Sequence, residues 1–196
     1  MRRSVKEFCR ACVACQRSKT VRHIKTPLMP FPKPTARFAS LNLDLVGPLP
    51  QAEGFTYLLT IMDRFSRWME AIPLPDITAS TCARALVRHW VARYGVPQHL
   101  VTDQGRQFTS SLWRELMVLL GTSHAMTTSY HPQSNGLIER FHRTMKERLM
   151  ARTHSAGTGT WMDHLPFVLL GLRAAVREDS DCSPCLLYTS PSPRDS

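Results

Sequence analysis

Leu41-Asn-Leu-Asp-Leu-Val46 alternates apolar and polar side chains as a half-buried strand does, and it stops at Gly47-Pro48. Two further runs rich in strand-forming residues follow, at Tyr57–Met62 and Arg67–Ile72. The turn-forming residues Asp63–Ser66 separate them. We therefore predict a three-stranded antiparallel meander at the start of the folded region.

Downstream of the meander, helical and strand patterns alternate. Thr78 fits an N-cap and Gly95 a helix stop, which predicts a helix over 78–94. The next predicted elements, in chain order, are a strand at His99–Asp103, a helix at Ser110–Leu120, a strand at Ser123–Thr127, a loop at 128–135, a long helix at 135–152 and a helix at Trp161–Val176. The order strand-strand-strand-helix-strand-helix-strand-helix predicts an α/β fold, with a mixed five-stranded sheet flanked by helices.

Composition excludes several classes of protein. The chain has 196 residues, 43% hydrophobic and 20% charged, which is too apolar for a wholly disordered chain and unlike collagen or a small disulfide scaffold. No apolar stretch approaches the roughly 18–20 residues that cross a bilayer, so no membrane association is expected. The N-terminus lacks the apolar segment of a secretory signal, and we expect a protein that is not secreted.

Positive charge is concentrated at the N-terminus. The formal net charge is +10, and residues 1–37 hold ten Lys or Arg against one acid, Glu7. Residues 20–37 also contain four prolines and are interpreted as a basic, extended linker. This excess favours a polyanionic partner, and a merely solvated tail is the alternative.

Five of the six cysteines lie near the two ends of the chain. A four-cysteine zinc site built from both ends fits the spacing of Cys12-Val-Ala-Cys15 and Cys182-Ser-Pro-Cys185 but is rejected here. Residues Cys185 to Asp195 match the translation of a sequencing-library adapter at all eleven positions. We therefore interpret 185–196 as an adapter-derived artefact outside the natural chain.

Three acidic residues stand at positions where a sheet and a helix can meet. Asp44 lies in the first strand, Asp103 ends the fourth, and Glu139 lies in the long helix. Clustered carboxylates repel one another unless hard divalent cations bind between them, and Mg²⁺ prefers oxygen ligands. The group therefore predicts a two-metal site for displacement at a phosphodiester.

The long helix carries two distinct faces. An apolar stripe predicted to be buried consists of Ile138, Phe141, Met145 and Leu149, and a polar face consists of Asn135, Glu139, Arg143 and Lys146. Lys146 lies two turns beyond Glu139, so it can reach a DNA phosphate while Glu139 holds a metal. The alternative is a solvated helix with an ion pair between Glu139 and Arg143.

Other polar residues are assigned structural roles. Asp63 is predicted to be a turn residue after the second strand rather than a fourth metal ligand. Cys82, His89 and Trp90 are predicted to lie on the packed side of their helix.

Three sequence blocks resemble the catalytic blocks of retroviral-type integrases, closest to those of gypsy-type long-terminal-repeat retrotransposons. They are Asp44-Leu-Val-Gly-Pro-Leu-Pro50, Val101-Thr-Asp103-Gln-Gly-Arg-Gln-Phe-Thr-Ser110 and His131-Pro-Gln-Ser-Asn-Gly-Leu-Ile-Glu139-Arg-Phe-His-Arg-Thr-Met-Lys146. Thirty-five residues separate Asp103 from Glu139, which is the spacing in this family's signature. The resemblance runs from about Val5 to Pro184 and implies a ribonuclease-H-like fold.

The resemblance also implies an activity. Asp44, Asp103 and Glu139 carry over as catalytic residues that bind two Mg²⁺ or Mn²⁺ ions. The implied enzyme is a polynucleotidyl transferase that trims the 3′ ends of element DNA and joins them to target DNA. His131 and Gln133 fall in the family's active-site loop and are expected, with Asn135, Arg143 and Lys146, to contact double-stranded DNA.

The resemblance further divides the chain. Residues 1–19 resemble the closing half of a His-His-Cys-Cys zinc module, with Cys12 and Cys15 as zinc ligands. Zn²⁺ is expected only where the two upstream histidines are present in a longer protein. Residues 38–184 form the expected catalytic core, which acts as a homo-oligomer at full length. The site of action is expected to be nuclear, after a cytoplasmic stage.

Two other functions are compatible with part of this pattern. A decayed or domesticated copy would act only as a DNA-binding module, although all three carboxylates are present. A ribonuclease H acting on RNA–DNA hybrids would share the fold and the metals. The 35-residue interval and Asn135-Gly136 before Glu139 favour integrase over ribonuclease H.

Overall fold

The computed structural model describes residues 34, 36–127, 132–156, 159–176 and 181–189, without the side chains of 132–140 and 154–156. The chain divides into two units, Met1–Pro30 and Phe31–Ser196, and every described residue belongs to the second. The predicted zinc-module segment 1–19, most of the linker 20–37, and His131 lie outside the described residues. Within the described ranges, no helix combines the length and apolarity that a membrane crossing demands.

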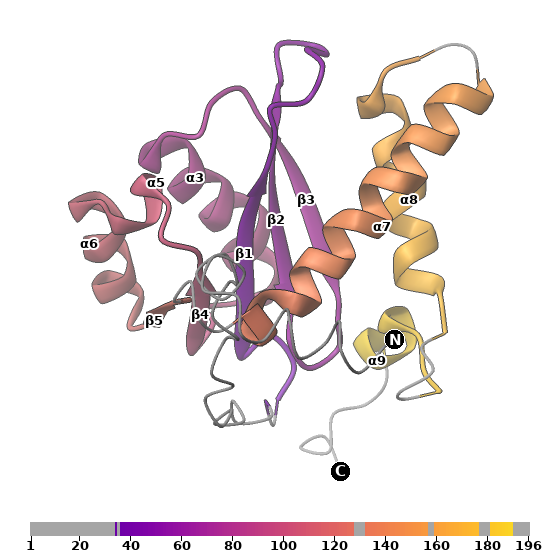
Figure 1. The fold of residues 1–196 in the computed structure, drawn as a ribbon. Coiled ribbons are helices and arrows are strands. Elements are labelled where there is room, and N and C mark those ends of the chain that lie inside the picture. Colours follow the sequence, from indigo (N-terminus) through magenta and orange to yellow (C-terminus); the bar gives the residue numbers. More distant parts are fainter. Residues whose placement is uncertain (1–33, 35, 128–131, 157–158, 177–180, 190–196) are drawn as a thin grey trace, which may run out of the picture. The chain divides into compact units, whose positions relative to one another are not determined.

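A mixed five-stranded sheet forms the centre of the second unit, in the order β3-β2-β1-β4-β5 (Figure 1). Its strands are β1 Ser40–Val46, β2 Tyr57–Asp63, β3 Met69–Leu74, β4 His99–Thr102 and β5 Ser123–Met126. β1 pairs antiparallel with β2 and parallel with β4, so the sheet changes direction beside β1. The predicted fold class is confirmed.

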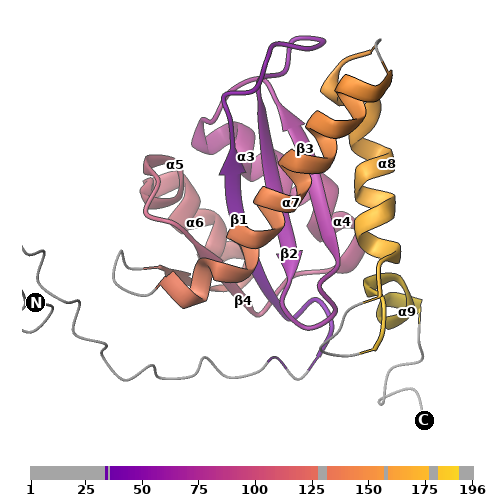
Figure 2. The ribbon, with the colours of Figure 1, turned by 45° about the vertical axis from the view of Figure 1, so that its right-hand side comes forward.

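Helices cover both faces of the sheet. They are α3 Ala79–Leu86, a π-helical turn η1 Val87–Val91, α4 Ala92–Tyr94, α5 Arg106–Thr109, α6 Ser111–Leu120, α7 Pro132–Ala156, α8 Trp161–Ala174 and α9 Pro184–Thr189. In Figure 2, α7 runs across the front of β1 to β3 with α8 beside it, and α3 lies behind. Each face therefore has its own hydrophobic core.

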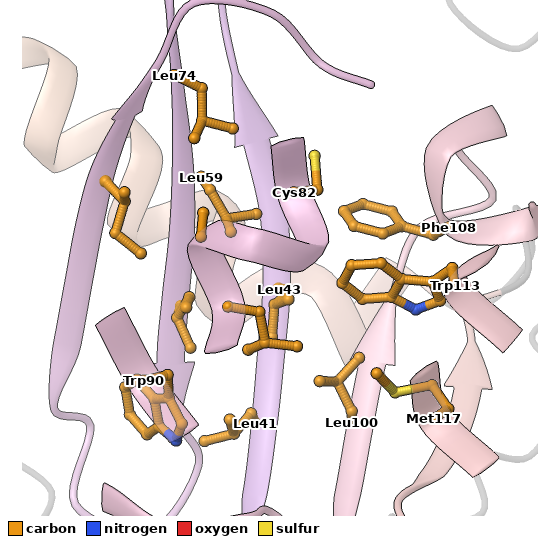
Figure 3. Close-up of a cluster of buried hydrophobic side chains, with 14 residues drawn as sticks. Leu41, Leu43, Leu59, Leu74, Cys82, Trp90, Leu100, Phe108, Trp113 and Met117 are labelled. Atoms are coloured by element: carbon orange, nitrogen blue, oxygen red, sulfur yellow. The ribbon is translucent and has the colours of Figure 1, made fainter. Parts of the chain in front are cut away.

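The core on the α3 side joins alternate strand residues to helices α3, α5 and α6 and to the π-helical turn η1. Leu41 and Leu43 of β1 pack there with Leu59 of β2, and Trp90, Phe108 and Trp113 close the cluster from the helices (Figure 3). Burying each of these side chains contributes roughly 1.5–3 kcal/mol. Cys82 and Trp90 are both buried in this core, as predicted, whereas His89 is only half-buried.

The core on the α7 side uses the other strand residues. Val46, Leu58 and Met62 face Met145 of α7, and Leu165 and other residues of α8 complete the cluster. Phe141, Met145 and Leu149 are buried, which confirms the predicted stripe at these three positions. The side chain of Ile138 lies outside the described residues.

Several predicted boundaries were wrong, for local reasons. The third strand begins at Met69 and not Arg67, because Arg67 adopts φ +62° and donates its N–H to Asp63 O to close the turn. The long helix begins at Pro132 and not at 135, so Gln133 is a helical residue rather than a loop residue. Proline is favoured at the first position of a helix because it has no backbone N–H, and an N–H at that position would have no partner within the helix.

Three helical features differ from the predictions. The helix predicted over 78–94 begins after the Thr78 cap as expected but contains the π turn η1. α5 was not predicted, and α8 ends at Ala174, two residues early. α9 covers the first residues of the segment assigned to an adapter, and Arg37 donates to the carbonyls of Leu187 and Tyr188 there. The origin of residues 185–196 stays a prediction.

Candidate active site

The parallel register of β1 and β4 places two predicted catalytic acids near each other, where β4 ends beside β1. The ladder pairs Asn42 with Val101, and Asp44 and Asp103 each stand two residues further along. Because side chains two apart in a strand share a face, both acids belong to the face that α7 covers. Asp44 and Asp103 are each partly exposed at this position.

Both carboxylate oxygens of Asp44 lie close to polar nitrogen atoms. The backbone N–H of Leu45 donates to Oδ1 over 2.7 Å. Oδ2 lies 3.5 Å from Nδ1 of His142 on α7. The Asp44 side chain is 20% exposed and that of His142 is 13% exposed. The carboxylate therefore has a defined orientation at the border between the sheet and α7.

His142 also reaches β2. Its Nε2 lies 2.7 Å from the Oγ1 of Thr60, which in turn lies 2.9 Å from the backbone carbonyl of Asp44. Thr60 is the direct ladder partner of Asp44. One imidazole thus connects two strands of the sheet to the helix that crosses them.

The imidazole of His142 is neutral at pH 7. Burial, and to a smaller extent the nearby positive charge of Lys146, lowers its pKa to about 4. The contact between His142 and Asp44 consequently joins an uncharged imidazole to a carboxylate and is not an ion pair.

Asp103 is anchored in a similar way at the end of β4. Its Oδ1 accepts a hydrogen bond from the Gly105 N–H over 3.0 Å. The preceding residue, Thr102, points to the opposite face, where its Oγ1 lies 2.9 Å from Nε2 of His124. The Thr102 hydroxyl also donates to the carbonyl of Asp103 over 2.8 Å, which ties the backbone of the acid to the second face.

Asp63 has a structural role, as the sequence predicted. Its side chain is fully buried at the end of β2. Oδ1 accepts the N–H of Phe38, and Oδ2 accepts both the N–H and the hydroxyl of Ser66. Burial raises the pKa of this carboxyl, and the hydrogen bonds oppose that effect. These bonds close the turn between β2 and β3.

The remaining predicted site residues belong to α7 or lie outside the described residues. Glu139, Asn135 and Gln133 are in α7, and their side chains are outside the described part. Arg143 and Lys146 are both exposed. His131, Cys12 and Cys15 are not described.

Comparison with known proteins identifies the family. Patterns described as integrase core domain match residues 34–132 and residues 120–165, and the first alone covers half of the chain. The chain belongs to the integrase core domain family. This integrase core is also 28% identical over 186 residues to the Tf2-3 and Tf2-4 transposon polyproteins of Schizosaccharomyces pombe. These alignments cover 94% of the chain but only 14% of each polyprotein.

Solved structures show the same fold. A chain of the simian T-cell lymphotropic virus intasome in complex with the PP2A regulatory subunit B56 gamma superposes with a TM-score of 0.75 at 21% identity, covering 97% of this chain and 68% of that one. The catalytic core of BIV integrase gives 0.62 at 25% identity, covering 77% and 93%. The HTLV-2 integrase core in complex with magnesium gives 0.63 at 18% identity, covering 77% and 96%. The ribonuclease-H-like fold expected of the integrase core is thereby confirmed.

The donors of the integrase core suit a divalent cation. Among the described side chains there is no group of three or more His, Cys, Asp or Glu that could hold a metal. The described part nevertheless contributes two carboxylates, Asp44 and Asp103, each oriented through Oδ1 by a backbone N–H. Carboxylate oxygens are the ligands that Mg²⁺ prefers, so these residues fit the metal that the family implies.

Sequence reasoning missed His142 and Thr60. His142 lies one helical turn after Glu139, a spacing that places the two residues on neighbouring parts of one face. That spacing was a usable signal for His142. Nothing in the local sequence of Thr60 indicates a neighbour 82 residues away.

Proposed function

We propose that this chain is the catalytic core of an integrase from a retrotransposon polyprotein, and that it joins element DNA to target DNA. The proposed reactions are trimming of the element's 3′ ends by water and attack of the new 3′ hydroxyls on target phosphodiesters. Asp44, Asp103 and Glu139 are the proposed metal-binding catalytic residues, with two Mg²⁺ or Mn²⁺ ions.

The placement of Asp44 and Asp103 carries this proposal. The two acids stand at one edge of adjoining parallel strands, and His142 of α7 reaches the first of them. Glu139 precedes His142 by three residues, so the backbone of α7 carries the third acid within one turn of the residue that contacts Asp44. Asp44 within β1, Asp103 directly after β4 and Glu139 in α7 together account for all three acids of the signature.

Different side chains would bind the metal ions and the DNA in the proposed reaction. Divalent ions bound by the carboxylates would supply polarisation of the attacking and leaving oxygens. The anchored rotamers of Asp44 and Asp103 would hold those ions in a fixed place. The exposed cations Arg143 and Lys146 would neutralise phosphates of the bound DNA. His131, Gln133 and Asn135 are proposed to contact DNA at the start of α7.

The partners and location follow from the same proposal. Double-stranded DNA is the proposed partner, and the full-length protein is proposed to act as a homo-oligomer in the nucleus. Cys12 and Cys15 are proposed to bind Zn²⁺ when the upstream histidines of a longer protein are present. The basic segment 1–37 would add sequence-independent attraction to DNA.

Reversal of strand joining tests the proposed activity. The whole chain would be incubated with Mg²⁺ or Mn²⁺ and a branched DNA that mimics the integration product, with an Asp103→Asn variant in parallel. We expect metal-dependent resealing by the unaltered chain and none by the variant. If the folded protein binds DNA but does not reseal the branched substrate, the result would support the alternative hypothesis, in which this chain is a decayed or domesticated copy that only binds DNA.

A further inference from the structure

The His142 imidazole occupies a place from which it can orient a proposed catalytic carboxylate. One ring nitrogen lies 3.5 Å from Asp44 Oδ2 and the other lies 2.7 Å from Thr60 Oγ1. Asp44 and Thr60 are ladder partners on β1 and β2, whereas His142 comes from α7. The ring therefore spans the junction at which the helix meets the sheet.

The protons available at this junction limit the possible arrangements. A neutral imidazole carries one N–H, and the Thr60 hydroxyl carries one O–H. That hydroxyl has two acceptors nearby, the Asp44 carbonyl at 2.9 Å and His142 Nε2 at 2.7 Å. Which nitrogen of the His142 ring carries the proton therefore depends on whether the Thr60 hydroxyl donates to the Asp44 carbonyl or to His142 Nε2.

The ionised carboxylate decides between the two ring tautomers. With the proton on Nε2, the lone pair of Nδ1 would face the negative Oδ2 of Asp44, which is repulsive. With the proton on Nδ1, the ring donates to Oδ2 and accepts from Thr60 at Nε2, and a bond to a charged acceptor is about twice as strong as a neutral one. The 3.5 Å separation is long for a hydrogen bond, as such contacts often are before substrate binds.

We propose that His142 is a positioning residue, which donates from Nδ1 to Asp44 Oδ2 and is held in that tautomer by the Thr60 hydroxyl. This inference rests on the proposed function, since its purpose is to aim the Asp44 carboxylate at a metal. Partners that orient a ligand in this way affect metal affinity by roughly 10–100-fold.

A second histidine gives a matched comparison within the same chain. His124 contacts Thr102 through Nε2 at 2.9 Å, and Thr102 donates to the carbonyl of Asp103. That pair lies on the α6 side, where the His124 ring lies edge-on to Trp113, so it supports the backbone and not a carboxylate. His124→Ala therefore removes a histidine–threonine contact of the same kind, on the face of the sheet away from the Asp44 carboxylate.

Nitrogen NMR of the histidine rings in the metal-free full chain tests the tautomer directly. We expect His142 to show a protonated Nδ1 and an unprotonated Nε2, and we expect Thr60→Val to weaken that preference while Thr60→Ser keeps it. A His142 ring protonated at Nε2 in the unaltered chain would overturn the proposal. This measurement is independent of any DNA reaction.

Metal binding by the same proteins tests the consequence. Mn²⁺ affinity, measured by water-proton relaxation, should fall about tenfold or more in His142→Ala. His142→Asn, whose amide nitrogen can occupy the place of Nδ1, should keep most of the affinity, whereas His142→Gln, which reaches only toward Thr60, should not. If Mn²⁺ affinity falls equally in His142→Asn and His142→Gln, and in proportion to their loss of stability, His142 is a packing residue and the proposal is wrong.

One further variant separates this inference from the proposed function. Asp44→Asn should abolish tight Mn²⁺ binding if Asp44 is a metal ligand. A loss in Asp44→Asn with unchanged affinity in all His142 variants would refute the positioning role alone. Unchanged affinity in Asp44→Asn itself would refute the metal site on which both proposals rest.

Discussion

Asp63 lies at one end of the β1–β2 ladder and Asp44 lies near its middle, and their surroundings give the two acids different roles. Asp63 is enclosed and takes its three hydrogen bonds from Phe38 and Ser66. Asp44 is partly exposed and faces the polar atoms of His142. A buried carboxylate that accepts hydrogen bonds from the surrounding turn stabilises the fold. A partly exposed carboxylate such as that of Asp44 can bind a metal ion.

Asp63→Ala should destabilise the protein by about 3 kcal/mol, because it leaves buried N–H groups without acceptors. Urea unfolding measures this loss, and Glu115→Gln on the exposed side of α6 provides the control. Mn²⁺ affinity of the folded variant should stay as in the unaltered chain. A variant of normal stability that loses metal would make Asp63 a ligand instead.

The stability of the fold should decrease at acid pH in part because of His124. Burial lowers its pKa below the ordinary 6.5, so the unfolded chain takes up a proton at His124 before the folded chain does. Its contribution to stability is therefore present above pH 6.5 and is lost as the pH falls through the lowered folded-state value. Urea midpoints between pH 7 and pH 5 should fall less steeply in His124→Gln, and parallel slopes would contradict the assignment.

At the scale of elements, α7 is fixed to the sheet by one apolar stripe while its other residues serve the site. Phe141, Met145 and Leu149 pack against β1 and β2, and His142 lies beside Phe141 in the sequence but points to Asp44. Since consecutive helical residues differ by about 100°, one helix can supply both the packing and the site. The position of the site therefore depends on the packing of this stripe.

Met145→Ala should cost about 2–5 kcal/mol, because its side chain is 0% exposed and its removal leaves a cavity between α7 and the sheet. Met150→Ala is the matched control, the same substitution on the same helix at a side chain 58% exposed, and should change stability by less than about 0.5 kcal/mol. Thermal unfolding of the two variants compares them. Equal effects would mean that α7 is not anchored by this stripe.

At the scale of the molecule, the two faces of the sheet have different roles in the proposed function. The α3 side holds the larger aromatic core, with Trp90, Phe108 and Trp113. The α7 side holds the acids and the exposed cations Arg143 and Lys146. A chain with net charge +10 would attract DNA in general, and within the described part the α7 side places exposed cations on the helix that reaches Asp44.

The salt dependence of DNA affinity should therefore change when a cationic side chain is removed from the α7 face, and not when one is removed from the opposite face. Arg143→Ala and Lys146→Ala should each reduce the slope of log affinity against log salt by about one, the change for one phosphate contact. Arg93→Ala, an exposed substitution on α4 behind the sheet, is the control and should leave the slope near its original value. Fluorescence anisotropy across a salt series measures all three. An equal effect at Arg93 would indicate diffuse attraction without a preferred face.

The sequence by itself determined the order of the five strands and the longer helices, the family resemblance and the spacing of Asp44, Asp103 and Glu139. Strand and helix periodicities and linear motifs are local properties of the chain. Its boundaries erred where a turn or cap overrode the pattern, as at Arg67 and Pro132. Only the tertiary structure decided that His142 meets Asp44 and Thr60. Contacts between residues 82 apart in the chain depend on strand register and on how a helix settles on its apolar stripe, and no local pattern encodes that packing.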